Sequence, residues 1–195
     1  MNHYDEEKHE YCVDGELKPN VTEICSPISF ERLNALQSSL LERAKQRGSR
    51  CHELFEEYLL VGEIDYDEIE PDYAPYIQQF VLWARSYRPK VIFTEKRLFG
   101  NEFCGTCDLI CEIDGKTILV DYKVTANADK KSLSVQLEGY YRLCSLYGIN
   151  IDECWYLHIK KDGYVFKPIK RNARWFDILL EHNTFMKEKY DGTSN

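Results

Sequence analysis

Long apolar segments are missing from this chain of 195 residues and 23.0 kDa. No stretch stays apolar for long enough to span a bilayer. The first residues, Met1 to Glu7, also lack the basic and apolar regions of a secretory signal peptide. We therefore expect a soluble, cytoplasmic protein with no membrane partner. Internal repeats and low-complexity tracts are missing too. From the length of the chain we expect residues 1–195 to form a single domain.

Regular cysteine spacing is also missing, although the chain has eight cysteines. Nothing indicates secretion, so we expect reduced thiols rather than disulfides. Cys104, Cys107 and Cys111 are close in sequence, and no cysteine follows Cys154. In a strand, alternation would put Cys107 and Cys111 on one face, opposite Asp108, and this predicts that both pack into the core.

Positive charge is scarce in the first part of the chain. The net charge is −8; residues 1–75 hold 18 acidic and 7 basic residues, whereas residues 76–195 hold 15 acidic and 18 basic. A chain this acidic lacks the basic footprint of most nucleic-acid-binding proteins. The cations of the second part could contact the phosphates of a nucleic-acid strand, or form an ordinary solvated face. These cations are Lys130 and Lys131 at the start of an expected helix, and Lys160, Lys161, Lys167, Lys170, Arg171 and Arg174 further on.

A tight hairpin is the strongest local signal that is present. Asp114-Gly115 lies between two β-prone runs, 108–113 and 117–123, which is typical of a two-residue hairpin turn. With that turn, the pairing carried outward from it places Asp108 directly opposite Asp121. Their Cβ atoms would then be about 5 Å apart.

Two carboxylates that face each other in this way repel, unless a positive charge lies between them. A hard divalent cation would fill that role. Lys123 lies on the same face of the strand as Asp121, so its ammonium is aimed at the same point. The alternative is that Asp108 and Asp121 are ordinary edge-strand residues that Lys123 neutralises.

The pattern of apolar and turn-forming residues predicts helices and strands along the whole chain. Residues 1–29 are expected to form turns and short strands. Helices are expected from Phe30, from near Gly48, from Tyr76 to before Pro89, from Ser132 to Tyr147 and from Trp175 to Tyr190, and further strands over Val91–Leu98, Glu153–Ile159 and Tyr164–Lys167. The leucines that indicate the first helix are Leu33, Leu36, Leu40 and Leu41.

His52 follows Gly48 by four residues on the second of these helices. A zinc-binding His-Glu-x-x-His helix is disfavoured, because position 56 is glutamate rather than a second histidine. Taken alone, His52 fits better as a partly exposed helix histidine with no task, since a single histidine carries little information.

The ordered set of these motifs resembles the PD-(D/E)xK nuclease superfamily, and in particular its RecB-like and phage-type exonuclease branch. Gly105-x-x-Asp108, then Asp121-x-Lys123, then Gln-x-x-x-Tyr on a helix carry the resemblance, together with an upstream Gly-x-x-x-His. The last two motifs are Gln136 to Tyr140 and Gly48 to His52.

The resemblance implies an α/β fold with a restriction-endonuclease-like αβββαβ core, in which helices flank a mixed central sheet. It also implies a Mg²⁺ or Mn²⁺ site and the hydrolysis of DNA phosphodiester bonds. By analogy, Asp108 and Asp121 bind the metal together with the carbonyl of Tyr122. Lys123 orients water or stabilises negative charge, while Glu95 and His52 complete the catalytic and metal-binding set.

Substrate contacts are implied for Gln136 and Tyr140 on their helix, and for Lys130 and Lys131 at its start. For Tyr140, core packing is the alternative. Some RecB-like nucleases hold an iron–sulfur cluster with one early cysteine and a C-terminal group of three. The closely spaced cysteines here lie in the hairpin strand, so we expect no iron–sulfur cluster.

The function that the resemblance implies best is a metal-dependent DNA exonuclease of phage or bacterial recombination and repair, acting in the bacterial or phage-infected cytoplasm. A single-strand annealing protein as partner, and a homo-oligomer, are implied by analogy alone. A non-catalytic nucleic-acid-binding or assembly protein on the same fold and a structure-specific endonuclease stay open as alternatives.

Overall fold

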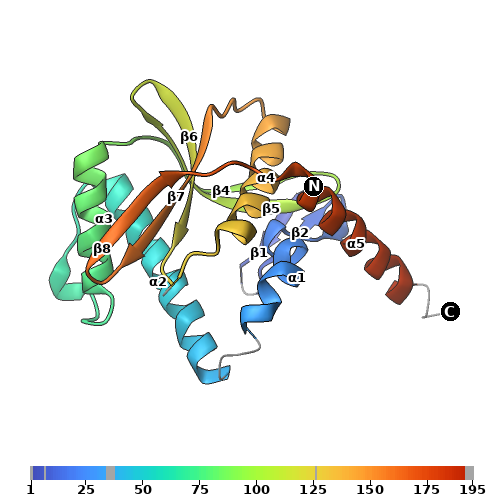
Figure 1. The fold of residues 1–195 in the computed structure, drawn as a ribbon, viewed down its shortest axis with the longest axis horizontal. Coiled ribbons are helices and arrows are strands. Elements are labelled where there is room, and N and C mark those ends of the chain that lie inside the picture. The colour runs from blue at the N-terminus through green and yellow to red at the C-terminus, as the bar shows by residue number, and fades with distance from the viewer. Residues whose placement is uncertain (1, 7, 34–37, 126, 192–195) are drawn as a thin grey trace.

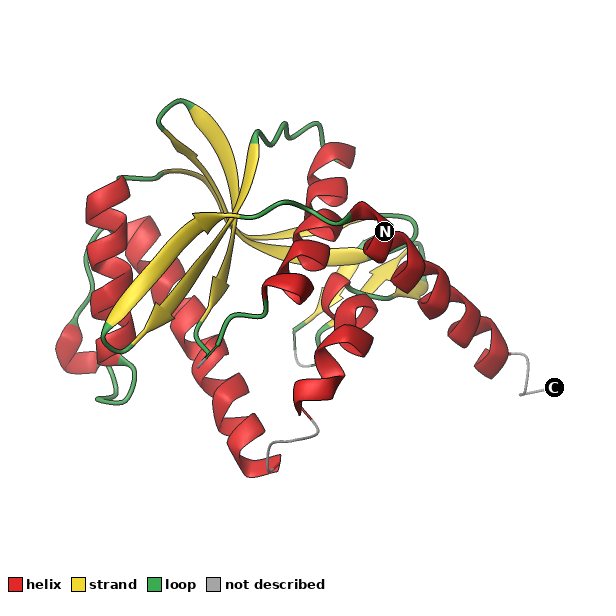
Figure 2. Ribbon diagram, in the orientation of Figure 1, coloured by secondary structure: helices red, strands yellow, loops and turns green. Residues whose placement is uncertain are grey.

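The structure is a computed structural model that describes residues 2–6, 8–33, 38–125 and 127–191. Within these ranges the chain forms five α-helices, a three-stranded sheet and a five-stranded sheet (Figure 1, Figure 2). This arrangement confirms the expected α/β class with helices around a mixed sheet. Among the helices described, none is long and apolar enough to cross a lipid bilayer.

The N-terminal residues form a small antiparallel sheet and then a helix. The elements are β1 (His3–Asp5), β2 (Glu10–Val13), β3 (Glu16–Lys18) and α1 (Val21–Leu33). The short strands are as expected, but the helix begins at Val21 rather than at Phe30, so the expectation for residues 1–29 was wrong in its last part. Asn20 explains the early start, because its side chain accepts a hydrogen bond from the Glu23 N–H at 2.9 Å, while its own N–H donates to Glu23 at 3.0 Å. Such reciprocal bonds cap a helix start.

The next helix is longer than the sequence suggests. α2 (Ser38–Val61) runs without interruption through Gly48, where we expected a helix to begin. A Cβ at Gly48 would have no heavy atom within 4 Å, so this glycine is simply an open position on a continuous helix. A glycine inside a helix costs only about 1 kcal/mol relative to alanine, which the packing of the rest of α2 easily offsets. Leu36, one of the leucines that predicted a helix here, lies outside the described residues.

The third helix matches its prediction. A short 3₁₀ turn, η1 (Tyr66–Glu68), leads to α3 (Ala74–Tyr87), which starts with Pro75 in its first turn. Proline is well suited to that place, since the first N–H groups of a helix have no partner inside it. The helix ends at Arg88, whose φ of 48° is left-handed.

The large sheet has the strand order β4-β5-β6-β7-β8. Only β6 and β7 are parallel, and the helix α4 connects them, so the sheet is mixed and the succession α3-β4-β5-β6-α4-β7 follows the expected αβββαβ order. The bounds are β4 (Lys90–Phe99), β5 (Cys104–Ile113), β6 (Lys116–Lys123), α4 (Lys130–Leu146), β7 (Glu153–Lys160), β8 (Gly163–Pro168) and α5 (Ala173–Asp191).

Helices cover both faces of this sheet and form two apolar clusters (Figure 1). α2 and α3 pack on one face around Phe55, Phe80 and Trp83. α1, α4 and α5 pack on the other around Ile24, Leu143 and related side chains. The site described below lies between these layers.

The closely spaced cysteines are all buried, but they do not share a face. Cys104 packs with the N-terminal sheet, Cys107 belongs to the cluster beneath α4, and Cys111 belongs to the cluster beneath α2 and α3. The expectation that Cys107 and Cys111 lie on one face was therefore wrong. Cys107 and Ile110, three residues apart, share a cluster, so the alternation of β5 is broken between them.

Candidate metal centre

The hairpin turn sets the position of the first acidic residue. Asp114 and Gly115 both have positive φ, 51° and 75°, as a two-residue hairpin turn requires. The register runs as predicted from the pair at the turn to Leu109↔Val120, where the ladder ends. Asp108 and Asp121 are the next residues, so they lie at the fork where β5 and β6 separate. The Asp108 carboxylate reaches across this fork and accepts a hydrogen bond of 2.6 Å from the backbone N–H of Tyr122.

Asp121 and Lys123 form an ion pair, as their shared face predicted, in which the carboxylate is buried and the amine is partly buried. Lys123 Nζ is 2.5 Å from Asp121 Oδ2, and the side chain of Asp121 is only 4 % exposed. Burial raises the pKa of the Asp121 carboxyl from its ordinary 3.8 to about 6, although the charge of Lys123 lowers it. Burial lowers the pKa of the Lys123 amine, but the charges of Asp121 and Asp108 more than compensate, so the net shift is upward. Lys123 is therefore a fixed positive charge at neutral pH.

A distortion in β4 brings Glu95 to the site. Thr94 pairs with Leu109 and Lys96 pairs with Cys107, so Glu95 lies opposite Asp108 in a gap of the ladder. Glu95 has a φ of 43°, a left-handed value that is uncommon for a residue other than glycine. Such strain often accompanies a functional position. Nothing in the sequence indicates this conformation.

His52 approaches the same two carboxylates from α2. Its Nδ1 is 3.4 Å from Glu95 Oε1 and 3.7 Å from Asp108 Oδ1. One donor atom from each of these three residues lies within 4.8 Å of the others, a grouping that can hold a metal ion. The cluster therefore joins α2, β4 and β5, and Asp121 and Lys123 of β6 lie next to it.

Burial also governs the ionisation of this cluster. It raises the pKa of the Asp108 carboxyl, and the charge of Glu95 raises it further, against the opposing effect of His52. Burial lowers the pKa of the His52 imidazole, but the charges of Asp108 and Glu95 raise it by more, so the net shift is upward. Among the described residues, Glu95 Oε1 is a buried oxygen that accepts no hydrogen bond of good geometry. Crowded carboxylates and an unsatisfied oxygen are a donor set that suits a hard divalent cation.

Tyr122 supports the site through packing. Its ring is 1 % exposed and makes edge contacts with His52, Phe55 and Phe80. The side chain therefore belongs to the core, and the part of Tyr122 that could serve a metal is its carbonyl, as the resemblance implies. The ring also limits the movement of His52.

A groove of about 900 Å³ opens beside the cluster, and His52, Glu95 and Asp108 form part of its lining. Of the residues expected to bind substrate, Tyr140 also lines it. A Cβ on Gly105 would come within 2.9 Å of the Tyr140 ring, so the glycine of Gly-x-x-Asp is needed for close packing.

The other expected substrate residues lie outside the lining of this groove. Gln136 is buried in α4. Lys130 and Lys131 are exposed at the start of α4, where the Lys130 ammonium is 5.9 Å from the centre of the Tyr156 ring. The structure thus groups Tyr140 with the metal cluster but does not group these three residues with it.

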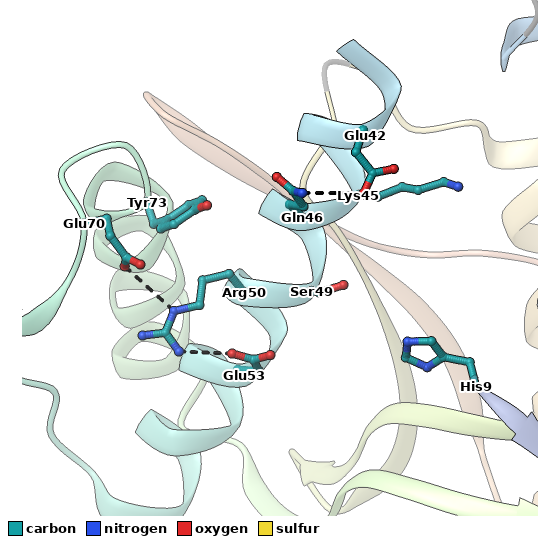
Figure 3. A pocket seen from close by; sticks show the side chains of 9 residues that line it. All are labelled: His9, Glu42, Lys45, Gln46, Ser49, Arg50, Glu53, Glu70 and Tyr73. Carbon is teal, nitrogen blue, oxygen red and sulfur yellow. Dashed lines mark hydrogen bonds and ion pairs between the residues drawn. The ribbon is translucent and has the colours of Figure 1, made fainter. Parts of the chain in front are cut away.

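The N-terminal sheet forms the far wall of the groove, which the sequence did not predict. The Tyr11 hydroxyl is 2.6 Å from the Thr106 hydroxyl, and Arg97 pairs with Glu6 at 2.7 Å beneath the Tyr4 ring. These contacts join residues about ninety positions apart, so no local pattern could reveal them. Figure 3 shows a neighbouring pocket, where His9 of the turn between β1 and β2 faces α2.

The lining of the groove is strongly acidic. Arg97 is opposed by six carboxylates, those of Glu6, Glu23, Glu53, Glu56, Glu95 and Asp108. Such a lining attracts cations, and it would repel a phosphate chain unless bound cations neutralise it. The charge of the groove therefore agrees with the metal cluster at its base.

Comparison with known proteins identifies no family for this chain. No family model matches the chain, and no curated protein matches its sequence. A crystal structure of a protein designated SSO0001 can be superposed with a TM-score of 0.47 and 15 % sequence identity, covering 91 % of this chain and 79 % of that one. Function has to be inferred from the chemistry of the site.

Proposed function

We propose that this protein is a metal-dependent DNA nuclease that hydrolyses phosphodiester bonds. The observation that carries the proposal is the grouping of His52, Glu95 and Asp108 within 4.8 Å of one another, beside the Asp121 and Lys123 pair. A site of three carboxylates and one fixed amine matches the needs of this reaction better than those of a passive core.

In the proposed site, Asp108, Asp121 and Glu95 would hold Mg²⁺ or Mn²⁺ through hard oxygen atoms, with the Tyr122 carbonyl and His52 completing the set. The bound ion would supply an activated water and would polarise the phosphate. Lys123 stays positively charged and is partly buried, so it would stabilise the negative charge that develops on the phosphate. Tyr140 supports the substrate strand along the groove.

The choice of DNA, and of exonuclease over endonuclease, rests on the resemblance to RecB-like and phage-type nucleases. A role in recombination or repair in a bacterial or phage-infected cytoplasm, an annealing protein as partner and a homo-oligomer follow from the same resemblance. The complete set of acidic residues and Lys123 favours an enzyme over a non-catalytic binding protein on the same fold.

The first prediction concerns cleavage. Purified protein with Mg²⁺ is incubated with end-labelled linear DNA and with covalently closed circular DNA, and we expect loss of the linear substrate alone. Asp108→Asn should abolish this activity. Lys123→Met should lower kcat about 10²- to 10³-fold, because it removes one charge that stabilises the transition state.

Lys116→Met is the matched control, because Lys116 lies at the other end of β6 and pairs with Glu153 on the surface. Loss of circular DNA as well would indicate an endonuclease. Binding without any cleavage would support the non-catalytic alternative, and full activity in Asp108→Asn would rule out the assigned site.

A further inference from the structure

A second hollow, of about 420 Å³, lies between α2, the start of α3 and the turn that joins β7 to β8. Arg43 and Arg47 line it from α2, and Lys161 lines it from the turn. Asp72 is the acidic residue in this lining. With three cations and one anion, this basic pocket has the opposite charge to the groove on the neighbouring face of α2.

Arg47 is held in place and still has free hydrogen-bond donors. Its Nε and Nη2 donate to the carbonyl of Val124 at 3.4 and 3.3 Å. A guanidinium has five N–H donors, so three remain available for a ligand. A planar group of fixed orientation suits a phosphate oxygen pair well.

Two cations of the basic pocket lie near the same aromatic ring. The Arg47 Cζ and the Lys161 Nζ lie 5.6 and 5.9 Å from the centre of the same ring, that of Tyr76. Among the described residues, no carboxylate lies within ion-pair distance of Arg43, Arg47 or Lys161. Like charges without partners raise the free energy of the unliganded protein, and a bound anion relieves this.

A paired arginine on the same helix shows the contrast. Arg50 reaches Glu53 at 3.0 Å and Glu70 at 3.8 Å, as Figure 3 shows. Its charge is neutralised within the protein. The charges of the basic pocket are not neutralised in this way, so they are available to an external anion.

The basic pocket lies next to the proposed metal centre along the chain. Val124, which Arg47 binds, directly follows Lys123. Arg47 precedes His52 by five residues of α2, which corresponds to about 7.5 Å along the helix axis. Along the helix axis, a phosphate in the pocket would thus be a few nucleotides from the metal cluster, on the adjacent face of α2, since one strand advances about 3.4 Å per nucleotide in duplex DNA.

We propose that the basic pocket binds a backbone phosphate of single-stranded DNA near the scissile bond. The identity of this ligand rests on the proposed nuclease function, whereas its phosphate chemistry rests on the pocket itself. Arg47 and Lys161 contact the phosphate, and Arg43 extends the contact along the strand.

The test measures binding without cleavage. The affinity of a fluorescein-labelled oligodeoxythymidylate is followed by fluorescence anisotropy in EDTA over a series of salt concentrations. Arg43→Ala and Lys161→Ala should each weaken binding about tenfold, as expected for a lost charged hydrogen bond. Each should also lower the slope of log affinity against log salt by about 0.7, the value for one phosphate contact on a single strand.

Lys45→Ala is the control, because Lys45 is an exposed cation of the same helix that lines the neighbouring hollow instead (Figure 3). Lys45→Ala should leave the slope of log affinity against log salt unchanged. Arg43→Lys should keep most of the slope of the unmodified protein. Unchanged slopes in both Arg43→Ala and Lys161→Ala would overturn the proposal. Inorganic phosphate that binds as tightly as the oligonucleotide, with both weakened alike by the variants, would also overturn it in favour of a free-phosphate site.

The failure of this proposal can be told apart from that of the nuclease proposal. Manganese binding by the same variants, measured by titration calorimetry, should match that of the unmodified protein. If no cleavage occurs but the slopes change as expected, the pocket stands and the nuclease proposal fails. If DNA is cleaved but the slopes are unchanged, the pocket proposal fails and the nuclease proposal stands.

Discussion

At the scale of single residues, burial sets the charge state of the site. Asp121 is 3 % exposed, and this burial raises its pKa to about 6, so the folded protein holds the charged carboxylate at a cost, even beside Lys123. A shift of about two pKa units corresponds to roughly 3 kcal/mol. The unliganded protein therefore carries a local instability at neutral pH, and a bound cation would remove it.

A prediction at this scale is a pH-dependent effect of Asp121→Asn in the presence of a chelator. The pKa of Asp121 rises from 3.8 in the unfolded chain to about 6 in the folded one, so the folded protein binds this proton more tightly. The contribution of this group to stability is then greatest below pH 4 and is lost as the pH rises to about 6. The asparagine of Asp121→Asn cannot ionise, so this variant does not lose stability in this way as the pH rises. Its free energy of unfolding should exceed that of the unmodified protein by ~1–3 kcal/mol at pH 7 and by much less at pH 4.

Urea unfolding at several pH values measures this difference. Glu181→Gln serves as the control, because Glu181 is an exposed carboxylate on α5. A stability difference between Asp121→Asn and the unmodified protein that does not vary with pH would show that Asp121 ionises normally.

At the scale of elements, local patterns predicted the hairpin correctly but not the starts of the first two helices. The hairpin at Asp114 and Gly115 and the register that follows depend on residues within a few positions of one another, so the sequence predicts them. The start of α1 at Val21 was also coded locally, by the capping pair of Asn20 and Glu23, but the turn-forming residues nearby hid it.

The candidate site was predictable to a similar degree. Asp108, Asp121 and Lys123 follow from the hairpin, and the resemblance supplies His52 and Glu95. The strained backbone of Glu95 and the wall made by Tyr11 could not be predicted, because both arise from packing between distant segments. The broken alternation of β5, on which the expectation for Cys107 and Cys111 depended, has no local signal in the sequence either.

Two glycines differ in the space around them, and we predict opposite effects of alanine at the two positions. Gly48 lies inside α2 with open space around it, so Gly48→Ala should stabilise the protein by about 0.5–1 kcal/mol. A Cβ added to Gly105 would lie only 2.9 Å from the Tyr140 ring. Gly105→Ala should therefore destabilise the protein by about 1–3 kcal/mol. Thermal unfolding of the two variants measures both effects.

Each variant is the control of the other, since both make the same chemical change. If Gly48→Ala proved destabilising, α2 would not be continuous at that residue. A harmless Gly105→Ala would mean that Tyr140 does not pack against β5.

At the scale of the whole molecule, charge is divided between surfaces. The groove that contains the metal cluster is acidic, whereas the pocket on the adjacent face of α2 is basic. The net charge of −8 thus conceals two sites of opposite sign. The negative charge of a nucleic-acid strand would attract it to the basic pocket directly, and to the acidic groove through a bound cation.

The prediction at this scale is that Mn²⁺ raises the temperature of unfolding of the whole protein. A ligand that binds only the folded state adds about 2.7 kcal/mol of stability at one hundred times its dissociation constant. Glu95→Gln should lose most of this gain, because it removes one of the clustered oxygen donors while keeping the shape of the side chain. Scanning calorimetry with and without Mn²⁺ measures the gain.

Glu56→Gln is the matched control, because Glu56 lines the same groove but is not part of the metal cluster. It should keep the full gain. An equal gain in Glu95→Gln would remove Glu95 from the set of ligands.

The contact between Tyr11 and Thr106 spans 95 residues and has a consequence for synthesis on the ribosome. β2 leaves the ribosome well before the strand against which it must pack. At about 5–20 residues per second, it waits roughly 5–20 s for its partner. During translation the groove therefore stays open on one side, and it is completed only once β5 has emerged.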